Sequence, residues 1–230
     1  MENHPLDNAC WYALGSRHRH LAEERGRARR YRPDVSVFAA LDGLDEESWA
    51  DLGALVGPSQ TTVVSRAEMP PGLARGWTER RRGRGIQMTV DPQKEADVEP
   101  VALRRLTVDD VPAMLELVAL TVPGPFLAGT IEMGAYYGHF DGGRLLSMAG
   151  ERLSLDGFTE ISAVCTHPDV RGRGLASALT THVAAAIAGR GEQPFLHVAE
   201  SNESARRLYR GLGFVERRAV DLVVLQSPPA

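Results

Sequence analysis

The residues best suited to chemistry gather in one glycine-rich loop, Arg171-Gly172-Arg173-Gly174-Leu175-Ala176. Residues 160–166 before it mix β-branched and small side chains, as a strand does, and residues 175–188 after it are good helix formers. Free backbone N–H groups and the positive end of the dipole at a helix N-terminus favour a phosphate or pyrophosphate. The glycines let an anion approach the backbone, and the two arginines add charged donors. The loop is therefore predicted to cradle a phosphate.

The same letter pattern occurs a second time in the chain, so the string alone is not specific. Arg80-Arg81-Arg82-Gly83-Arg84-Gly85 runs into the strand-like residues 86–90 and has no helix N-terminus beside it. A dinucleotide loop needs Gly-x-Gly-x-x-Gly and an acidic residue about 20 positions further on, which residues 171–176 do not provide. A Walker loop needs Gly-Lys-Ser/Thr, but the single lysine is Lys94. Only the loop at 171–176 has the strand, loop and helix order.

Three motifs in the right order resemble the second half of a GNAT acyltransferase domain. After the loop come the strand-like residues 195–199, a helix-like run that holds Asn202 and Tyr209, and then Gly213-Phe214. In that family the loop holds the pyrophosphate of acetyl-coenzyme A (acetyl-CoA), and the asparagine and tyrosine follow at this spacing. The resemblance covers about residues 98–225 and is strongest at 158–216. Ala176 replaces the commoner glycine, which the pattern tolerates.

The resemblance implies a mixed α/β sheet with the GNAT acyl-CoA N-acyltransferase fold, and acetyl-CoA as the cosubstrate without a metal. The coenzyme arm would enter where the two central strands part, and the N–H of Val164 or Cys165 would be the oxyanion donor. Asn202 suits a helix N-cap nearly as well as a coenzyme contact. The residues that the resemblance assigns to the coenzyme are Val164, Cys165, Thr166, Arg171, Gly172, Arg173, Gly174, Leu175, Ala176, Ser177 and Asn202.

Two side chains are candidates for proton transfer, because acyl transfer to an amine needs a base for the amine and an acid for the leaving thiolate. Glu160 lies eleven residues before Arg171, in the register of the catalytic glutamate of histone-type members. It would act directly or through a water; the alternative is a carboxylate that only caps the strand. Tyr209 is the candidate acid, since a tyrosine with a pKa of about 10 is protonated at neutral pH; the alternative is a core tyrosine that anchors its helix.

Other groups of side chains in the sequence are weaker indications of function. Cys165 and His167 suggest a nucleophile pair, but side chains two apart on a strand meet poorly, and no His, Cys, Asp or Glu cluster has metal-ligand spacing. The arginines of residues 75–84 are interpreted as a solvated hairpin rather than a nucleic-acid surface, because only Trp77 accompanies them. We therefore expect neither a metal nor a nucleic-acid partner.

Composition sets outer bounds on location and partners. The 230 residues are 43% hydrophobic and 24% charged with a formal net charge of −4, which is ordinary globular usage. No apolar run approaches the roughly 18 residues of a membrane span, and the first five residues do not resemble a signal peptide. Cys10 and Cys165 form no disulfide framework, so we expect a cytoplasmic protein; its oligomeric state is not predicted.

The polar residues 91–97 suggest a boundary between an N-terminal α/β unit, 1–91, and a catalytic GNAT domain, 98–230. In the second part we expect a strand at 101–106, a helix at 108–121 and a hairpin at 137–153. In the first part we expect a strand at 34–41, a helix at 45–56 and a strand at 61–65. Gly76-Trp77 followed by a charged run echoes Gly213-Phe214, which suggests a degenerate GNAT-like repeat; a chance echo is the alternative.

Three classes of function follow from the resemblance. The first is an N-acetyltransferase that moves an acetyl group from acetyl-CoA to a primary amine of a small or amino-acid-like acceptor by direct attack. The second is a coenzyme-binding regulatory protein without catalysis, and the third is a lysine or N-terminal acetyltransferase acting on proteins. A closed pocket at residues 123–137 would favour a small acceptor, and an open groove a protein.

Overall fold

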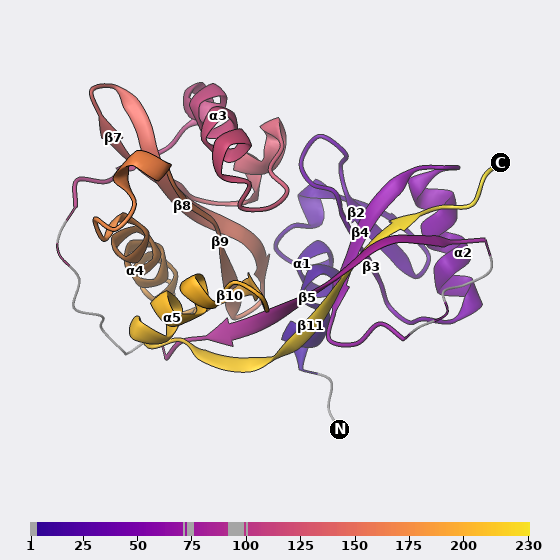
Figure 1. The fold of residues 1–230 in the computed structure, drawn as a ribbon. Coiled ribbons are helices and arrows are strands. Elements are labelled where there is room, and N and C mark those ends of the chain that lie inside the picture. The colour runs from indigo at the N-terminus through magenta and orange to yellow at the C-terminus, as the bar shows by residue number, and fades with distance from the viewer. Residues whose placement is uncertain (1–3, 71, 73–75, 92–98, 100) are drawn as a thin grey trace.

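The computed structural model describes residues 4–70, 72, 76–91, 99 and 101–230, and eleven strands in this part of the chain form one mixed sheet. Their order across the sheet is β1-β2-β3-β4-β11-β5-β10-β9-β8-β7-β6. Figure 1 shows the sheet running through both halves of the molecule, with helices on its faces. The strands are β1 (Ala22–Arg25), β2 (Ala28–Tyr31), β3 (Phe38–Leu41), β4 (Thr61–Arg66), β5 (Thr78–Thr89), β6 (Arg104–Arg105), β7 (Tyr136–Asp141), β8 (Arg144–Leu155), β9 (Phe158–Thr166), β10 (Gln193–Ala199) and β11 (Val215–Gln226).

Five α-helices and five short 3-10 helices join these strands in the described residues. The α-helices are α1 (Ala9–Gly15), α2 (Glu46–Val56), α3 (Val111–Thr121), α4 (Leu175–Ala188) and α5 (Glu203–Gly211). The 3-10 helices are η1 (Pro5–Asn8), η2 (Arg19–Leu21), η3 (Val108–Asp110), η4 (Ala128–Met133) and η5 (Pro168–Val170). The mixed α/β architecture predicted from the sequence is confirmed.

Most expected elements are present, and two strands are shorter than predicted. The helix at 175–188, the helix at 108–121 and the hairpin at 137–153 appear as α4, η3 with α3, and β7 with β8. Of residues 101–106 only Arg104–Arg105 pair as a strand, and after them the N–H of Thr107 donates to Asp110 Oδ2, at 2.8 Å, in the cap of η3. The strand at 34–41 begins only at Phe38, because the N–H groups of Val35 and Ser36 turn back to the carbonyl of Arg32.

Helices cover both faces of the sheet beside the glycine-rich loop. Met148 packs with residues of α3, whereas its neighbour Ala149 packs with residues of α4. Because successive side chains of a strand point to opposite faces, α3 and α4 lie on opposite sides of β8. The cluster that includes Cys10, Leu14 and Phe195 brings α1 of the N-terminal segment onto the sheet as well.

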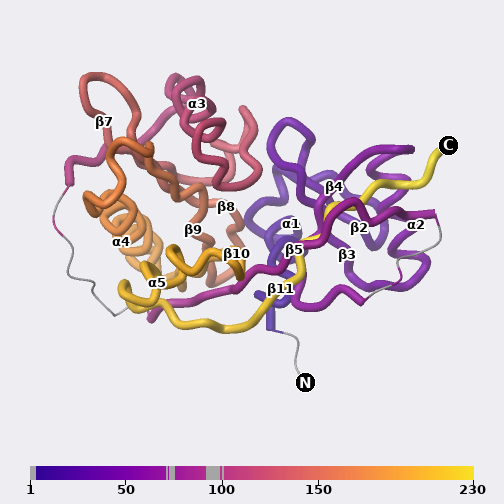
Figure 2. The backbone as a smooth tube through the Cα atoms, in the orientation of Figure 1, coloured from indigo at the N-terminus to yellow at the C-terminus, as the bar shows by residue number. Residues whose placement is uncertain are grey.

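The two long strands β5 and β11 tie the N-terminal and C-terminal parts together. β5 lies between β10 and β11: it pairs with β10 from Phe195↔Thr89 to Ala199↔Gly85, and with β11 along most of its length. The far end of β11 pairs in turn with β4. Figure 2 shows both strands passing from one half of the molecule into the other, so each part of the chain contributes a strand to the other half of the sheet.

The expected strand, helix, strand order in the first part is present as β3, α2 and β4, with β3 and β4 parallel. Asp45 caps α2 as predicted, since its Oδ1 accepts the N–H of Ser48 at 3.0 Å. Residues 92–98 of the predicted boundary lie outside the described part of the chain. The division at 1–91 and 98–230 and the degenerate repeat therefore stay predictions.

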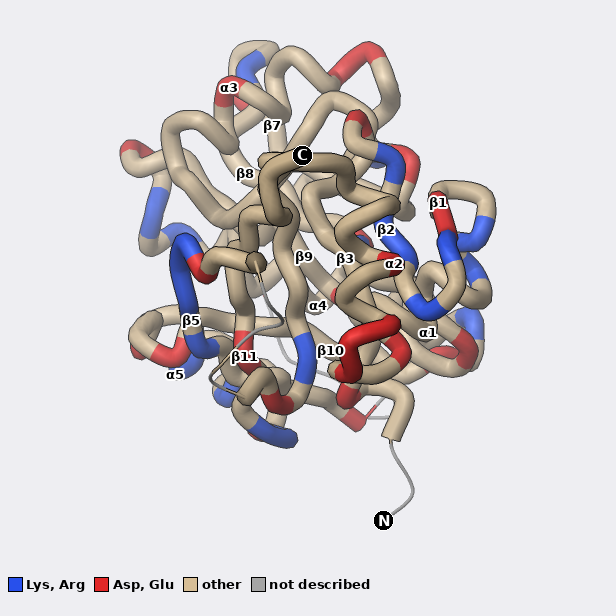
Figure 3. The backbone as a smooth tube through the Cα atoms, turned by 90° about the vertical axis from the view of Figure 1, so that its right-hand side faces the viewer, with Lys and Arg blue, Asp and Glu red and all other residues tan. Residues whose placement is uncertain are grey.

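Arginines of β5 have acidic or amide side chains as partners. Arg82 pairs with Glu79 at 2.7 Å and with Asp221 of β11 at 3.5 Å, and Arg80 donates to Gln226. Figure 3 shows the blue segment of β5 next to red segments rather than in one basic field. This mixture agrees with a solvated pair of strands.

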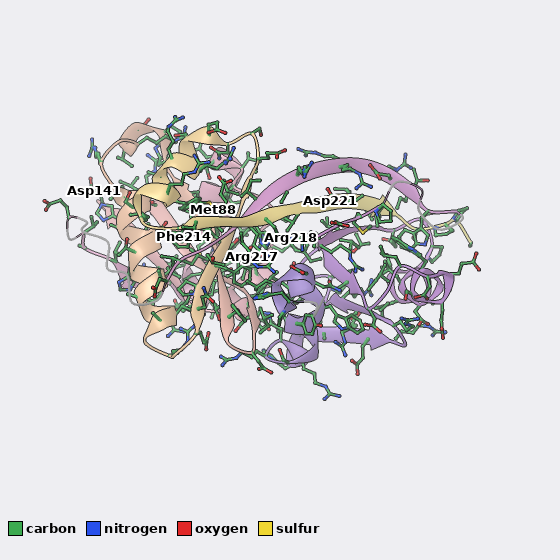
Figure 4. The ribbon with its side chains drawn as sticks, turned by 90° about the horizontal axis from the view of Figure 1, so that it is seen from below. Met88, Asp141, Phe214, Arg217, Arg218 and Asp221 are labelled. Atoms are coloured by element: carbon green, nitrogen blue, oxygen red, sulfur yellow. The ribbon has the colours of Figure 1, made fainter. Side chains whose placement is uncertain are left out.

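Met88 tests whether β5 is an integral part of the C-terminal sheet. Its side chain is fully buried in the cluster that α4 forms with β10, although it comes from the N-terminal part, and it lies close to Phe214 in Figure 4. Met88→Ala is expected to lower the free energy of unfolding by about 2–5 kcal/mol, because it leaves a cavity in that cluster. Chemical denaturation followed by circular dichroism measures this loss. Arg81→Ala, on an exposed position of the same strand, should stay within about 0.5 kcal/mol; an equal loss in both variants would contradict the packing.

Candidate functional site

The site is a cleft that opens where β9 and β10 part. The two strands pair in parallel only from Phe158↔Gln193 to Ile161↔Leu196, although β9 continues to Thr166 and β10 to Ala199. Just beyond this point the pairing of β9 with β8 shifts register, and Ala163 adopts a left-handed conformation with φ 53°. Such a bulge bends a strand. A cleft of about 790 Å³ lies between the diverging strands.

Nearly every residue that the sequence assigned to the coenzyme lines this cleft. The members are Val164, Cys165, Thr166, Arg171, Gly172, Gly174, Leu175, Ala176, Ser177 and Asn202; Arg173 alone of the predicted set does not line it. The structure thus brings together residues from β9, the glycine-rich loop, the first turn of α4 and the start of α5. The roles predicted for them at a coenzyme stay predictions.

The loop has the geometry that an anion cradle needs. Gly172 and Gly174 have φ values of 80° and 76°, which L-residues rarely adopt, and no atom lies within 4 Å of where a Cβ would stand. Gly174 is also the N-cap of α4, so the first N–H groups of that helix have no intrahelical acceptor. Arg171 donates from Nε to the carbonyl of Thr166 at 3.3 Å, which holds its side chain against the end of β9.

Tyr209 and Asn202 enter the cleft from α5. Tyr209 is 8% exposed, and burial raises the pKa of its hydroxyl to about 12, so the hydroxyl is protonated at neutral pH. Asn202 caps the helix, because its Oδ1 accepts the N–H of Ala205 at 3.1 Å, and it also lines the cleft. The two sequence interpretations of Asn202 are therefore compatible.

Glu160 is fully buried and does not line the cleft. Its Oε2 and Oε1 accept from Arg152 Nε and Nη2 at 2.9 and 2.6 Å, and Oε1 also contacts His197 Nδ1 at 2.7 Å. Burial would raise the pKa of this carboxyl, but the opposing charge of Arg152 and the hydrogen bonds from Arg152 and His197 lower it to about 2. Glu160 is therefore a carboxylate at neutral pH, and these contacts favour an indirect role. Its assignment as the base stays a prediction.

Two cleft residues, Arg152 and His197, escaped the sequence analysis. Both line the cleft at the end away from the glycine-rich loop, and both contact Glu160. His197 is an ionisable side chain in the mostly apolar strand β10, which is a signal by which it could have been found, whereas Arg152 follows Glu151 in β8 and has no such signal.

The tautomer of His197 follows from its neighbours. Gln87 of β5 donates from Nε2 to the carbonyl of Leu6 at 2.9 Å, and its Oε1 accepts from Arg217 at 2.8 Å. The amide orientation is thereby set, and Gln87 Nε2 must also be the donor in its 3.0 Å contact with His197 Nε2. His197 is thus neutral, with its proton on Nδ1 and directed at Glu160. Figure 4 shows Arg217 and its neighbour Arg218 on β11 at the junction of the two halves.

The cleft is also lined by Thr121, Val122 and Pro123 at the end of α3, and the η4 segment that follows them is held by the N-terminal part. Thr130 donates its hydroxyl to the carbonyl of Val35 at 2.7 Å, and Glu132 pairs with Arg32 at 2.8 Å. His18 Nε2 lies 2.9 Å from the carbonyl of Met133, and burial lowers the pKa of this imidazole to about 4, so it is a neutral donor there. The N-terminal part therefore holds in place the segment that follows this part of the cleft lining.

The described residues contain no group of three or more His, Cys, Asp or Glu side chains that could hold a metal ion. Burial raises the pKa of the Cys165 thiol to about 11, which leaves it protonated at neutral pH. The arrangement combines a glycine-rich loop at a helix N-terminus, two diverging strands and a buried tyrosine hydroxyl.

Comparison with solved structures identifies the family. A GNAT family protein from Novosphingobium aromaticivorans is 36% identical; the match covers 99% of this chain and 100% of that chain, with a TM-score of 0.89. The chain belongs to the GNAT family. A model of FR47-like proteins matches residues 136–223, which include β7 to most of β11. No curated protein matches the chain.

A more distant structure shows the same fold over the whole length. A GCN5-related N-acetyltransferase from Kribbella flavida is 18% identical, with 98% of this chain and 95% of that chain covered and a TM-score of 0.64. As a member of the GNAT family, the chain described here is an acyltransferase. Acetyltransferases of the family use acetyl-CoA as cosubstrate. In the described residues no helix is long and apolar enough to cross a membrane.

The buried carboxylate gives the first test of the site. Glu160→Gln is expected to cost about 3–5 kcal/mol of unfolding free energy, because it leaves Arg152 buried without its counter-charge. The folded pKa of Glu160 is lower than its usual value of 4.5, so its contribution is present above about pH 4.5 and is lost as the pH falls toward 2.

Denaturation at pH 7 and at pH 3 measures both effects. The difference in unfolding free energy between the wild type and Glu160→Gln should be smaller at pH 3 than at pH 7. Glu203→Gln, an exposed carboxylate on α5, is the matched control and should change stability by less than about 1 kcal/mol. A Glu160→Gln protein as stable as this control would refute the description of the ion pair.

Proposed function

We propose that this protein transfers an acetyl group from acetyl-CoA to a primary amine of a small or amino-acid-like acceptor, by direct attack of the amine on the thioester. The observation that carries the proposal is the single cleft between β9 and β10, which the glycine-rich loop, the free edge of β9 and Tyr209 all line. The protein's membership of the GNAT family supports the same chemistry.

The proposed coenzyme contacts follow the length of the cleft. The N–H groups of the glycine-rich loop and of the first turn of α4 receive the pyrophosphate, with Arg171 and Arg173 as charged neighbours. Beyond the point where it leaves β10, the edge of β9 offers backbone groups of Val164 to Thr166 to the pantetheine arm, as an edge strand does. The N–H of Val164 or Cys165 stabilises the oxyanion. Acetyl-CoA itself supplies the activated acyl group and a good leaving thiolate.

Proton transfer is assigned to two groups, one that protonates the leaving thiolate and one that deprotonates the attacking amine. As the C–N bond forms and the C–S bond breaks, the hydroxyl of Tyr209 protonates the thiolate. We propose that Glu160 acts as base through His197, which lines the cleft while Glu160 does not. The carboxylate holds the proton on Nδ1 and stabilises the imidazolium formed when Nε2 accepts the amine proton. The amide of Gln87, which donates to Nε2, must first release it.

The acceptor side favours a small molecule over a protein. The end of α3 and the loop after it line the cleft at Thr121 to Pro123, and η4, which follows, is tied to residues 34–35 by the hydroxyl of Thr130 and by the N–H of Gly129. A neighbouring segment that is held in place in this way favours a small acceptor over an extended protein substrate. We therefore propose a small acceptor. A cytoplasmic location also stays a proposal.

Acetyl-CoA binding is tested by thermal stabilisation. A ligand at 100 times its Kd stabilises the folded state by about 2.7 kcal/mol, so the Tm of the wild type should rise by several degrees. Gly174→Glu should abolish that rise, because the new carboxylate stands where the pyrophosphate binds. Gly191→Glu is the matched control: Gly191 has a φ of 77° and equally open surroundings, but lies in the turn after α4, outside the cleft. Equal stabilisation of all three proteins would reject the coenzyme site.

Tyr209→Phe tests the acid. Loss of general acid catalysis lowers kcat by about 100-fold or more, while the KM for acetyl-CoA changes little. Release of the coenzyme thiol with a panel of amines measures kcat. Because the pKa of Tyr209 is raised to about 12, the wild-type rate should show no loss from this group until the pH nears that value. Tyr12→Phe, an exposed tyrosine on α1, should behave as wild type; a Tyr209→Phe protein of normal kcat would remove Tyr209 from the mechanism.

A further inference from the structure

A small hollow adjoins the cleft on the acceptor side. It lies between the loop after α3 and strands β8 and β9, and it shares Arg152, Ser162 and Ala163 with the cleft. Its volume of about 10 Å³ is enough for roughly one water-sized group. The two spaces meet at the bulge of β9, next to the proposed oxyanion donor. A group in the hollow can therefore belong to a molecule that is bound in the cleft.

Tyr136 brings an unused donor to this hollow. Its side chain is 1% exposed, and its hydroxyl has no hydrogen-bond partner among the described residues. The ring lies over Gly150, where an added Cβ would come within 2.2 Å of it, and stands edge-on to Phe126 at 5.6 Å between centroids. The ring cannot turn away, so the hydroxyl stays unpaired until something enters. A buried unpaired hydroxyl costs about 1–3 kcal/mol, and such a cost suggests a ligand.

Arg152 brings a second donor. Its Nε and Nη2 bind Glu160, whereas Nη1 makes no hydrogen bond within the described part of the chain. The charge of Arg152 is already balanced by Glu160, and His197 is neutral by the hydrogen-bond argument given above. The hollow thus offers hydrogen-bond donors in a buried place with no net charge.

We propose that the hollow binds a neutral carbonyl oxygen of the acceptor, and that the acceptor is therefore a small α-amino amide. This assignment rests on the proposed acetyl transfer. A carboxylate fits less well, because it would add an uncompensated negative charge beside the buried Glu160. A plain amine would leave the Tyr136 hydroxyl unsatisfied.

Matched acceptors test this assignment. Glycinamide, glycine and ethylamine form one set, and phenylalaninamide, phenylalanine and phenethylamine a second. We measure kcat/KM for each by release of the coenzyme thiol. The amide should exceed the plain amine about three- to tenfold, as expected for one hydrogen bond to a neutral group, and the carboxylate should be the poorest of each set.

Two tyrosine variants assign the effect to the hollow. Tyr136→Phe removes the donor and should bring the ratio of amide to amine toward one. Tyr137→Phe is the matched control, because the next residue of β7 points to the other face and packs on His182. It should keep the wild-type ratio.

Several results would overturn the inference. A ratio that Tyr136→Phe does not change would mean that the hollow holds only a water. A preference for the carboxylates, or a tripeptide turned over faster than the amides, would exclude a small neutral amide. If acetyl-CoA stabilises the protein but no amide reacts, the inference fails and the coenzyme site stands. If acetyl-CoA does not stabilise the protein, the proposed function itself fails.

Discussion

The buried carboxylate of Glu160 is the interaction on which the site depends. Arg152 of β8 and His197 of β10 both bind it from the strands on either side of β9. Through the contact of His197 with Gln87, the network reaches β5 and the carbonyl of Leu6. These bonds join four strands close to the point where β9 and β10 part. A cleft between two strands would otherwise be a weak place in the sheet, because it interrupts the hydrogen-bond ladder.

The N-terminal part belongs to the site because its strand β5 pairs with β10, while β11 of the C-terminal part pairs with β4. β5 pairs with the other edge of β10, from Phe195 to Ala199, and so holds that strand in the sheet beyond the point where it has left β9. The same part of the chain holds η4 from the other side, through Val35 and Arg32. The walls of the cleft are therefore fixed by residues far from it in sequence, and changes in the N-terminal part should be felt at the site.

The coenzyme loop could be predicted from the sequence because all its parts are local. A strand, two glycines and a helix N-terminus follow one another within residues 160–188, and each has a residue signature of its own. The position of β5 could not be predicted, because its pairing with β10 joins residues more than 100 positions apart and no local pattern encodes it. Arg152 and His197 were missed for the same reason: their roles arise from neighbours on other strands. Glu160 was chosen for its register, which says nothing of the arginine that lowers its pKa.

The central claim is that the parting of β9 and β10 makes an acyl-CoA site. A crystal structure of the protein with acetyl-CoA tests it most directly. The account predicts the pyrophosphate on the N–H groups of residues 172–177 and the thioester carbonyl at the N–H of Val164 or Cys165, with its sulfur beside the hydroxyl of Tyr209. Coenzyme bound anywhere else, or a thioester remote from Tyr209 and the bulge of β9, would contradict it.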